Sequence, residues 1–280
     1  MPSYNIMSIT IEKIKSWKNK KNFAAITAYD FTSAKIVDQS KIPIILVGDS
    51  ASMITYGYES TIPVSMDQML LVTRAVTRAV KTSLVVGDMP FLSYQSSPSL
   101  AVKNAGLFLK EGQVSAVKLE GGVAISKHIK KIVDFGIPVM GHVGLTPQSV
   151  NQLSGYKVQG KSISSAQKIL DDARAVQDAG AFSIVLECIP HELAEKITAI
   201  LDIPTIGIGS GPSCDGQIQV FHDILGLDKD FSPKHAKKYG DLHINISSHL
   251  KKYLLEVNQK QFPEKKHYTS CSNSIIDKLK

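Results

Sequence analysis

Eight short apolar runs recur along this chain, and each leads into a polar or glycine-containing end and then into a helix-like stretch. Their nearly unbroken hydrophobicity and their β-branched residues are typical of strands that are buried on both faces, as in a parallel sheet. We expect the strands within residues 23–30, 42–49, 82–88, 115–120, 137–142, 182–187, 203–209 and 216–221. This alternation of strand and helix indicates an α/β fold built on a parallel sheet.

Helical patterns fill the longer intervals between these strands. The expected helices cover residues 65–82, 97–113, 165–181 and 189–202. Ser65 precedes apolar residues at helical spacing, which predicts an N-cap. Gly112 and Gly180 stand at the ends of the second and third helices and predict C-caps, because glycine readily adopts the left-handed conformation that ends many helices.

The number of units predicts how the sheet is arranged. Seven to eight strand–helix units fit 280 residues and favour a (β/α)8 TIM-type barrel. A doubly wound open sheet is the alternative, but it usually has a glycine-rich turn after its first strand, and "AYDFTSAK" is not such a turn. We expect one barrel domain over residues 8–260, in which a terminal helix within 232–260 covers the barrel. A polar, Lys-rich and flexible tail should follow over residues 261–280.

Composition argues against several other classes of protein. The net charge of +7 comes largely from lysines near the two ends, without interleaved aromatic residues, which indicates a solvated surface and no nucleic-acid site. No apolar run approaches the roughly 18 residues of a membrane span, and the first residues show no leader with a small-residue cleavage site. Cys188, Cys214 and Cys271 lack metal-site spacing. We therefore expect a cytoplasmic protein whose partners are small molecules, not nucleic acid or membrane.

Ionisable side chains end six of the eight expected strands. These are Asp30, Asp49, Asp88, Lys118 with Glu120, His142, and Glu187. In a barrel, the carboxyl ends of the strands surround one mouth, where catalytic residues lie. A single aspartate in such a place often only caps the next helix. Several carboxylates around one mouth would repel one another, however, unless protons or a cation neutralised them.

A divalent metal ion is the simplest way to neutralise them. Carboxylate ligands without cysteine favour a hard ion, and Mg²⁺ binds through one or two carboxylates while leaving positions for substrate oxygens. We expect Asp49 and Asp88 to be direct ligands, with Glu120 held through water or at the edge of the shell. A 2-oxo acid could chelate such an ion, which would make the neighbouring carbon acidic.

A reaction at that carbon needs a base and groups that hold the substrate. Glu187 follows an apolar strand, and its surroundings could raise its pKa towards neutrality, as a general base requires. Lys118 and the Ser50 hydroxyl can hold a substrate carboxylate. His142 is either a proton carrier, a substrate-orienting group or a hydrogen-bonded structural histidine. The loop "GIGSGP" over residues 207–212 either binds phosphate through its N–H groups or is a tight turn that needs glycine.

A series of short motifs, in this order, resembles the ketopantoate hydroxymethyltransferase (3-methyl-2-oxobutanoate hydroxymethyltransferase) family over roughly residues 8 to 250. The motifs are "TAYD", "ILVGDS", "GYESTIPVSMDQM", "VVGDMPF", "AVKLEGG", "GHVGLTPQS", "YKVQGK", "IVLECIP", "IGIGSGPSCDGQIQVFHDILGL" and "SPKHAKKY". The resemblance implies a (β/α)8 barrel of the phosphoenolpyruvate mutase/isocitrate lyase group. It also implies Mg²⁺ as cofactor and a large homo-oligomer, often a decamer.

The resemblance further implies a reaction and the residues that perform it. The family transfers a one-carbon unit from 5,10-methylenetetrahydrofolate, its co-substrate, to 3-methyl-2-oxobutanoate, forming 2-dehydropantoate for pantothenate and coenzyme A synthesis. Asp49, Asp88 and Glu120 match the family's metal positions. Ser50, Asp88 and Lys118 match the positions that hold the keto acid.

Glu187 in "VLEC" matches the family's proton acceptor, which would take the C3 proton to give an enolate. Two departures from the family pattern bear on geometry: Ser52 replaces a usual glycine beside the metal, and Gly87 replaces a usual alanine before the second metal position. Two other functions stay open from the sequence. One is a Mg²⁺-dependent lyase or aldolase that acts on another 2-oxo acid, and the other is a barrel that only binds a ligand.

Overall fold

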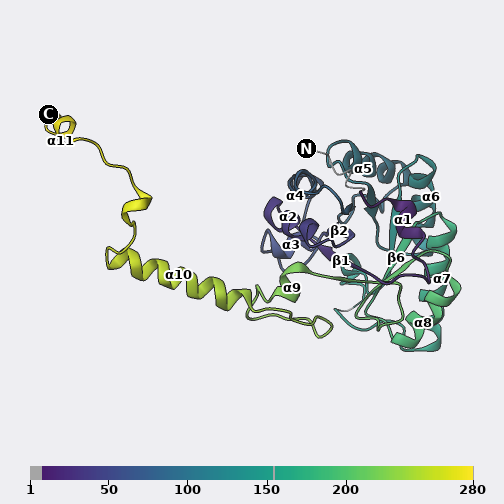
Figure 1. Cartoon of the computed structure of the whole chain (residues 1–280). Coiled ribbons are helices and arrows are strands. Elements are labelled where there is room, and N and C mark those ends of the chain that lie inside the picture. The colour runs from purple at the N-terminus through teal and green to yellow at the C-terminus, as the bar shows by residue number, and fades with distance from the viewer. Residues whose placement is uncertain (1–7, 154, 280) are drawn as a thin grey trace. The chain divides into compact units, whose positions relative to one another are not determined.

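Each strand pairs in parallel with the next along the chain, and the last strand pairs with the first, so that a barrel closes in the order β1-β2-β3-β4-β5-β6-β7-β8. Figure 1 shows the whole chain, with helices arranged outside the strands. The structure is a computed structural model and describes residues 8–153 and 155–279; the expectation of no leader falls on residues outside these ranges. The predicted (β/α)8 barrel is confirmed, and the doubly wound alternative is wrong.

Each of the eight predicted runs overlaps a strand, and only β5 extends past the end of its run, at 142. The strands are β1 (Phe23–Thr27), β2 (Ile44–Val47), β3 (Leu84–Asp88), β4 (Ala116–Lys118), β5 (Val139–Gly144), β6 (Ser183–Glu187), β7 (Thr205–Ile208) and β8 (Gly216–Gln219). Most are shorter than the apolar runs that predicted them, because the ends of those runs leave the sheet. The run at 216–221 illustrates this, since its last residue, Phe221, already begins a helix.

Helices follow the strands as predicted. They are α1 (Ile11–Lys15), α2 (Phe31–Gln39), α3 (Ala51–Ile54), α4 (Met66–Ala79), α5 (Pro98–Lys110), α6 (Ser126–Asp134), α7 (Ile163–Asp178), α8 (His191–Ile200), α9 (Phe221–Leu225), α10 (Leu242–Asn258) and α11 (Asn273–Ile276). All four predicted helices are present. Short 3-10 turns cover Val123–Ile125, Pro147–Ser149 and Lys265–His267. None of the described helices has both the length and the hydropathy that a membrane span requires.

The predicted helix caps have mixed outcomes. Ser65 accepts a hydrogen bond from the Gln68 N–H and completes a capping box, as predicted. Gly180 follows α7 in the left-handed conformation, at φ +95°, so its prediction is also confirmed. The prediction for Gly112 is wrong, because α5 ends at Lys110 with Glu111 as its C-cap, and the left-handed residue after it is Gln113, at φ +56°. Gly112 is needed for space, since a Cβ there would lie 2.5 Å from the Phe108 carbonyl oxygen.

The chain divides into two compact units. The first runs to Phe221 and includes Lys234–Ala236, and the second consists of His222–Pro233 and Lys237 onward. The first unit holds the whole barrel. The second contains α10, the predicted terminal helix, none of whose residues is buried. The expected boundaries at 8–260 and 261–280 stay a prediction, as do the flexible tail and the covering role of the terminal helix.

The side chains that point into the barrel are apolar at one end of the strands and charged at the other. Leu84, Val86 and Asp88 share one face of β3, since side chains two apart point the same way. The first two of these belong to one core cluster inside the barrel, which also includes Ile14 and Trp17 from α1 and the turn after it. The Trp17 ring lies 5.5 Å from that of Phe23, at the start of β1. The amino-terminal end is therefore packed with apolar side chains, and charge is left to the carboxyl ends.

Gly87 has the opposite orientation from Asp88 and faces the helices. A Cβ at Gly87 would lie 2.5 Å from Cδ1 of Phe108, a fully buried residue of α5. The glycine thus allows an aromatic side chain to pack directly against β3. Ser52 has its own structural role, because its buried hydroxyl donates a hydrogen bond to the Ser60 carbonyl oxygen at 2.6 Å. Both departures from the family pattern therefore have a local physical reason.

We expect Gly87→Ala to destabilise the protein by about 1–3 kcal/mol, the usual cost of overpacking a core. The double variant Gly87→Ala/Phe108→Leu should recover part of this loss, because the smaller side chain makes room for the methyl group. Urea unfolding followed by circular dichroism measures both effects. A Gly87→Ala protein as stable as the wild type would contradict this account of the packing.

Candidate active site

Charged and polar side chains gather at the carboxyl ends of β2 to β6. The set consists of Asp49 just after β2, Asp88 at the end of β3, Lys118 at the end of β4 with Glu120 beyond it, His142 in β5 and Glu187 at the end of β6. All but Glu187 are at most 5% exposed. The pattern arises because side chains two apart on a strand point the same way. The inward-facing series on each of these strands begins with apolar residues and ends in a polar one, always at the carboxyl end of the barrel.

Lys118 connects this cluster. Its Nζ donates hydrogen bonds to both carboxylate oxygens of Asp88, each at 2.8 Å, and lies 4.0 Å from Oε1 of Glu120. Burial alone would lower the pKa of Lys118, but the charges of Asp88, Glu120 and Asp49 outweigh burial and raise it. The lysine is therefore a permanent cation in a buried site.

The remaining charge is more than Lys118 can balance. Burial, assisted by the charge of Asp88, raises the pKa of Asp49 to about 7, although Lys118 and a hydrogen bond from Gln148 oppose the shift. Burial also raises the pKa of Glu120 well above its ordinary value. Near neutral pH Asp49 therefore holds a proton in part, and a divalent cation would compete with that proton for the carboxylate.

His142 lies between two carboxylates. Its Nδ1 is 3.6 Å from Oε1 of Glu120, and its Nε2 is 3.2 Å from Oε2 of Glu187. Neither ring nitrogen forms a hydrogen bond of good geometry with any of the residues that the structure describes. Burial and the nearby Lys118 charge lower the pKa of His142, so the imidazole is neutral at pH 7. Buried ring nitrogens that lack a well-formed hydrogen bond are typical of a place that a bound molecule completes.

Glu187 and Ser50 lie at the accessible side of the cluster. The Glu187 side chain is 16% exposed, against 5% or less for its charged neighbours. Ser50 is half-buried, and its hydroxyl is 2.8 Å from the Tyr29 hydroxyl. The structure thus brings together six of the residues that the sequence predicted for the site, Asp49, Asp88, Lys118, Glu120, His142 and Glu187, and places the seventh, Ser50, next to Asp49 in the chain. Their roles remain predictions.

Other strand-end residues and the glycine loop have structural roles. Asp30 is exposed and caps α2 by accepting hydrogen bonds from the N–H groups of Thr32 and Ser33. In the loop "GIGSGP", Gly209 and Gly211 have φ of +64° and +77°. A Cβ at Gly211 would lie 2.3 Å from that of His191, which supports the interpretation as a tight turn.

Gln148 is a residue of the site that the sequence did not single out. It lies in the Pro147–Ser149 turn after β5, is 3% exposed, and donates a hydrogen bond from Nε2 to Oδ2 of Asp49 at 2.9 Å. No periodicity or charge marks it. The sequence signals are its position in the loop after the strand that carries His142 and its place within the motif "GHVGLTPQS".

The site fits a hard cation of low protein coordination. Among the residues that the structure describes, no three His, Cys, Asp or Glu side chains are arranged to hold one metal ion together. Mg²⁺ does not need three, because it commonly uses one or two carboxylates and keeps water on its other positions. Asp49 and Asp88 are neighbours, since the Asp49 N–H donates to Oδ2 of Asp88 at 3.2 Å. Buried carboxylate oxygens suit such an ion.

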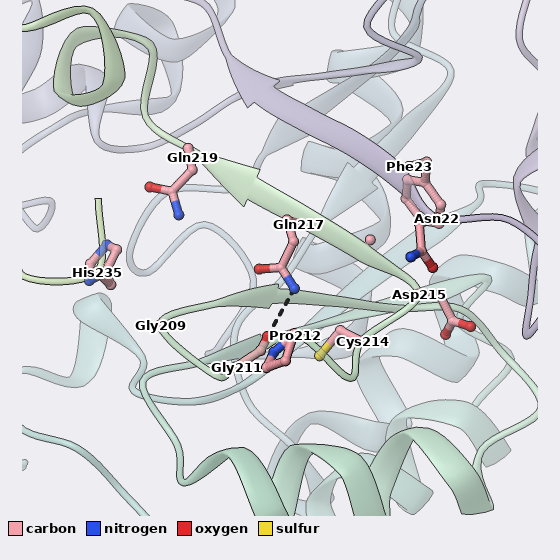
Figure 2. A pocket seen from close by; sticks show the side chains of 11 residues that line it. Asn22, Phe23, Gly209, Gly211, Pro212, Cys214, Asp215, Gln217, Gln219 and His235 are labelled. Carbon is pink, nitrogen blue, oxygen red and sulfur yellow. Dashed lines mark hydrogen bonds between the residues drawn. The ribbon is translucent and has the colours of Figure 1, made fainter. Parts of the chain in front are cut away.

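A cavity of about 510 Å³ lies elsewhere in the first unit, along β8 and the loop before it (Figure 2). Gln217 and Gln219 line it, and because they alternate with the core residue Ile218 they face the outside of the barrel. The Gln217 amide donates to the Gly211 carbonyl oxygen at 3.0 Å. None of the charged cluster lines this cavity, so it is not part of the candidate active site.

Comparisons of the fold agree with the barrel topology. The chain superposes on a crystal structure of phosphonopyruvate hydrolase with a TM-score of 0.60 and 13% identity, covering 97% of this chain and 94% of that one. Phosphoenolpyruvate phosphomutase from Streptomyces platensis subsp. rosaceus gives 0.62 at 10% identity, covering 96% and 94%. 2,3-Dimethylmalate lyase, a PEP mutase/isocitrate lyase superfamily member, gives 0.59 at 15%, covering 97% and 94%. These similarities establish the fold.

Sequence comparisons are more specific. The profile of the family described as ketopantoate hydroxymethyltransferase matches residues 8–265. The chain is 52% identical to the 3-methyl-2-oxobutanoate hydroxymethyltransferase of Dehalococcoides mccartyi, covering 98% of both proteins. It is also 52% identical to that of Carboxydothermus hydrogenoformans, covering 97% of this chain and 99% of the relative. The chain therefore belongs to the ketopantoate hydroxymethyltransferase family, and it is an enzyme, a hydroxymethyltransferase of pantothenate biosynthesis.

Proposed function

We propose that this enzyme transfers a hydroxymethyl group from 5,10-methylenetetrahydrofolate to 3-methyl-2-oxobutanoate and so forms 2-dehydropantoate. The observation that carries the proposal is the position of Glu187. Its side chain is 16% exposed and stands beside a cluster of buried charged groups, so a substrate can reach the carboxylate while lying against that cluster. Family membership supports the same reaction.

The proposal assigns the metal site to three carboxylates. Asp49 and Asp88 would hold Mg²⁺ directly, and Glu120 would contact the ion through water. Two direct ligands agree with the donor set described above and with the preference of Mg²⁺ for few protein ligands. When bound, the ion would act as a Lewis acid that makes the hydrogen next to a keto group more acidic.

Three polar side chains hold the keto acid. The Lys118 ammonium and the Ser50 hydroxyl bind the substrate carboxylate, the first by charge and the second by a hydrogen bond. His142 is neutral, so one of its ring nitrogens can accept and the other can donate. We assign it to orienting the keto acid beside Glu187, from whose carboxylate its Nε2 is 3.2 Å away.

Glu187 starts the reaction as a general base. Its carboxylate removes the proton from C3, and the electrons of the C–H bond pass to the keto oxygen to give an enolate. One C–N bond of the folate methylene opens to leave an iminium carbon, and C3 of the enolate attacks that carbon. Water then replaces the second nitrogen, and the two nitrogens take up the proton from C3 and one from water, so that tetrahydrofolate leaves. The folate carbon carries two C–N bonds and no oxygen, so water supplies the hydroxyl oxygen of the product.

Replacing Glu187 tests its role directly. Glu187→Gln should reduce the exchange of the C3 hydrogen of 3-methyl-2-oxobutanoate with solvent deuterium by about 10²-fold or more, because an amide cannot accept the proton. Proton NMR follows the exchange without any folate. The binding of Mn²⁺, a spectroscopic substitute for Mg²⁺, should be unchanged in this variant. Exchange at the wild-type rate would remove Glu187 from the role.

Metal removal tests the assigned cofactor. Formation of 2-dehydropantoate from 3-methyl-2-oxobutanoate and 5,10-methylenetetrahydrofolate should cease after treatment with a chelator and return when excess Mg²⁺ is added. A coupled assay of product measures both steps. Full activity in the chelated protein would contradict the metal assignment, and turnover of the keto acid that ignores the folate would contradict the assigned reaction.

A matched pair of lysine variants tests the substrate contact. Lys118→Met should raise the KM for the keto acid about tenfold to hundredfold, the loss expected for a hydrogen bond to a charged group. Lys18→Met is the control, because Lys18 also forms a largely buried ion pair, with Asp215 at 3.0 Å, but away from the carboxylate cluster. Steady-state kinetics should show an unchanged KM for the control. Equal KM values for both variants would rule out the contact.

The assembly and location belong to the same proposal. The resemblance implies a homo-oligomer, often a decamer, and the composition of the sequence favours a cytoplasmic protein whose partners are small molecules. Light scattering on the purified protein would measure the size of the assembly.

A further inference from the structure

Gln148 contacts two of the carboxylates that we assign to the metal site. Its side-chain Nε2 donates to Oδ2 of Asp49 at 2.9 Å, and its backbone N–H donates to Oε2 of Glu120 at 3.0 Å. The residue is 3% exposed, so water cannot replace these bonds easily. One residue of the loop after β5 thus connects the end of β2 to the segment after β4.

The Gln148 amide is fixed in one orientation. Its Oε1 accepts hydrogen bonds from the Tyr94 hydroxyl and from Nε2 of Gln95, both at 2.9 Å. Its Nε2 donates to the Met89 carbonyl oxygen at 2.9 Å as well as to Asp49. An amide offers two donors and two acceptor positions, and all of them are used here. A reversed amide would place donors against donors, so the NH₂ group has to face the carboxylate.

Tyr94 supports both the amide and Glu120. Its hydroxyl accepts a hydrogen bond from the Glu120 N–H at 3.0 Å, and the residue is fully buried. The Tyr94 hydroxyl also lies 2.9 Å from Oε1 of Gln148 and 3.0 Å from the Glu120 carbonyl oxygen, so its proton is placed for donation to the amide or to that carbonyl. The backbone that carries Glu120 and the amide that binds Asp49 therefore share one partner.

These contacts matter because the carboxylates repel one another. Lys118 holds Asp88, but Asp49 makes no ion pair within 4.0 Å among the residues described. Gln148 is a neutral donor that holds one oxygen of Asp49 and leaves the other available to a ligand. A neutral donor can do this without cancelling the negative charge that a cation requires.

We propose that Gln148 is a positioning residue that holds the Asp49 and Glu120 carboxylates in place for a divalent cation before the cation binds. This inference rests on the proposed function, because that proposal assigns the two carboxylates to the metal. Groups that orient metal ligands by hydrogen bonds typically change metal affinity by about 10- to 100-fold when they are removed.

The test is the binding of Mn²⁺ to the substrate-free protein, measured from the electron paramagnetic resonance signal of the free ion. Gln148→Met keeps the length of the side chain and the backbone N–H but removes the amide. We expect its Kd for Mn²⁺ to rise about 10- to 100-fold. With saturating Mg²⁺, kcat and the KM for the keto acid should return to within about threefold of the wild-type values, which a general loss of structure would not allow.

Two further variants keep the test decisive. Gln167→Met is the matched control, because the exposed Gln167 also donates to an aspartate, Asp171, at 2.8 Å on the surface of α7. Its Kd for Mn²⁺ should equal that of the wild type. If Gln148→Met does not fold, Gln95→Met takes its place. It removes only one of the bonds that orient the amide and should raise the Kd about threefold to tenfold.

The possible outcomes separate the two proposals. A folded Gln148→Met protein with wild-type affinity for Mn²⁺ would overturn the positioning role alone, as would an unchanged Gln95→Met if only that variant folds. A wild-type protein that binds no Mn²⁺ would overturn both the metal assignment and this inference. Weaker Mn²⁺ binding by the Gln148→Met variant would support the role of Gln148 even if the wild-type protein forms no 2-dehydropantoate. That lack of product would contradict the proposed reaction.

Discussion

The buried ammonium of Lys118 is the group on which the rest of the site depends. A closed barrel brings the carboxyl ends of its strands around one mouth, so acidic residues that are far apart in the sequence meet in a space with little water. Lys118 balances part of this charge through its two hydrogen bonds to Asp88. The negative charge that Lys118 does not balance helps to raise the pKa values of Asp49 and Glu120, for which burial is the largest cause. A buried site with more negative than positive charge is suited to a divalent cation.

The two ends of the barrel therefore carry different tasks. At the amino-terminal end, Ile14 and Trp17 pack into the same core as the first residues of the strands, which stabilises the barrel without any polar group. At the carboxyl-terminal end, polar groups replace this packing and reduce what the hydrophobic effect can contribute. Close contacts outside the barrel support the charged end, such as the ring of Phe108 against Gly87, one residue before Asp88. Stability and chemistry are thus assigned to opposite ends of the same strands.

Hydrogen bonds from loops complete what the strands begin. Strands fix the Cα positions of the charged residues, but a carboxylate on a short side chain can still rotate. Gln148 and Tyr94, which come from the loops after β5 and β3, hold the Asp49 carboxylate and the Glu120 backbone in one arrangement. His142 is the contrasting case, because its ring lies near two carboxylates and still has no hydrogen bond of good geometry among the described residues. The site combines rigid acidic groups with one imidazole that a substrate can engage.

The sequence by itself determined the class of fold, the approximate position of every strand, and the residues at the strand ends, because apolar periodicity and strand-end polarity are local properties. Motif resemblance added the family and the meaning of those residues. Tertiary structure alone decided which strand-end groups face one another, that Asp30 only caps a helix, and that Gly112 serves close packing in place of a cap. Gln148 is the clearest case, since a neutral residue in a loop acquires its role only when folding places it between Asp49, Tyr94 and Met89. The hydrogen bonds of Gln148 reach residues up to 99 positions away in the sequence, and no local pattern can encode them.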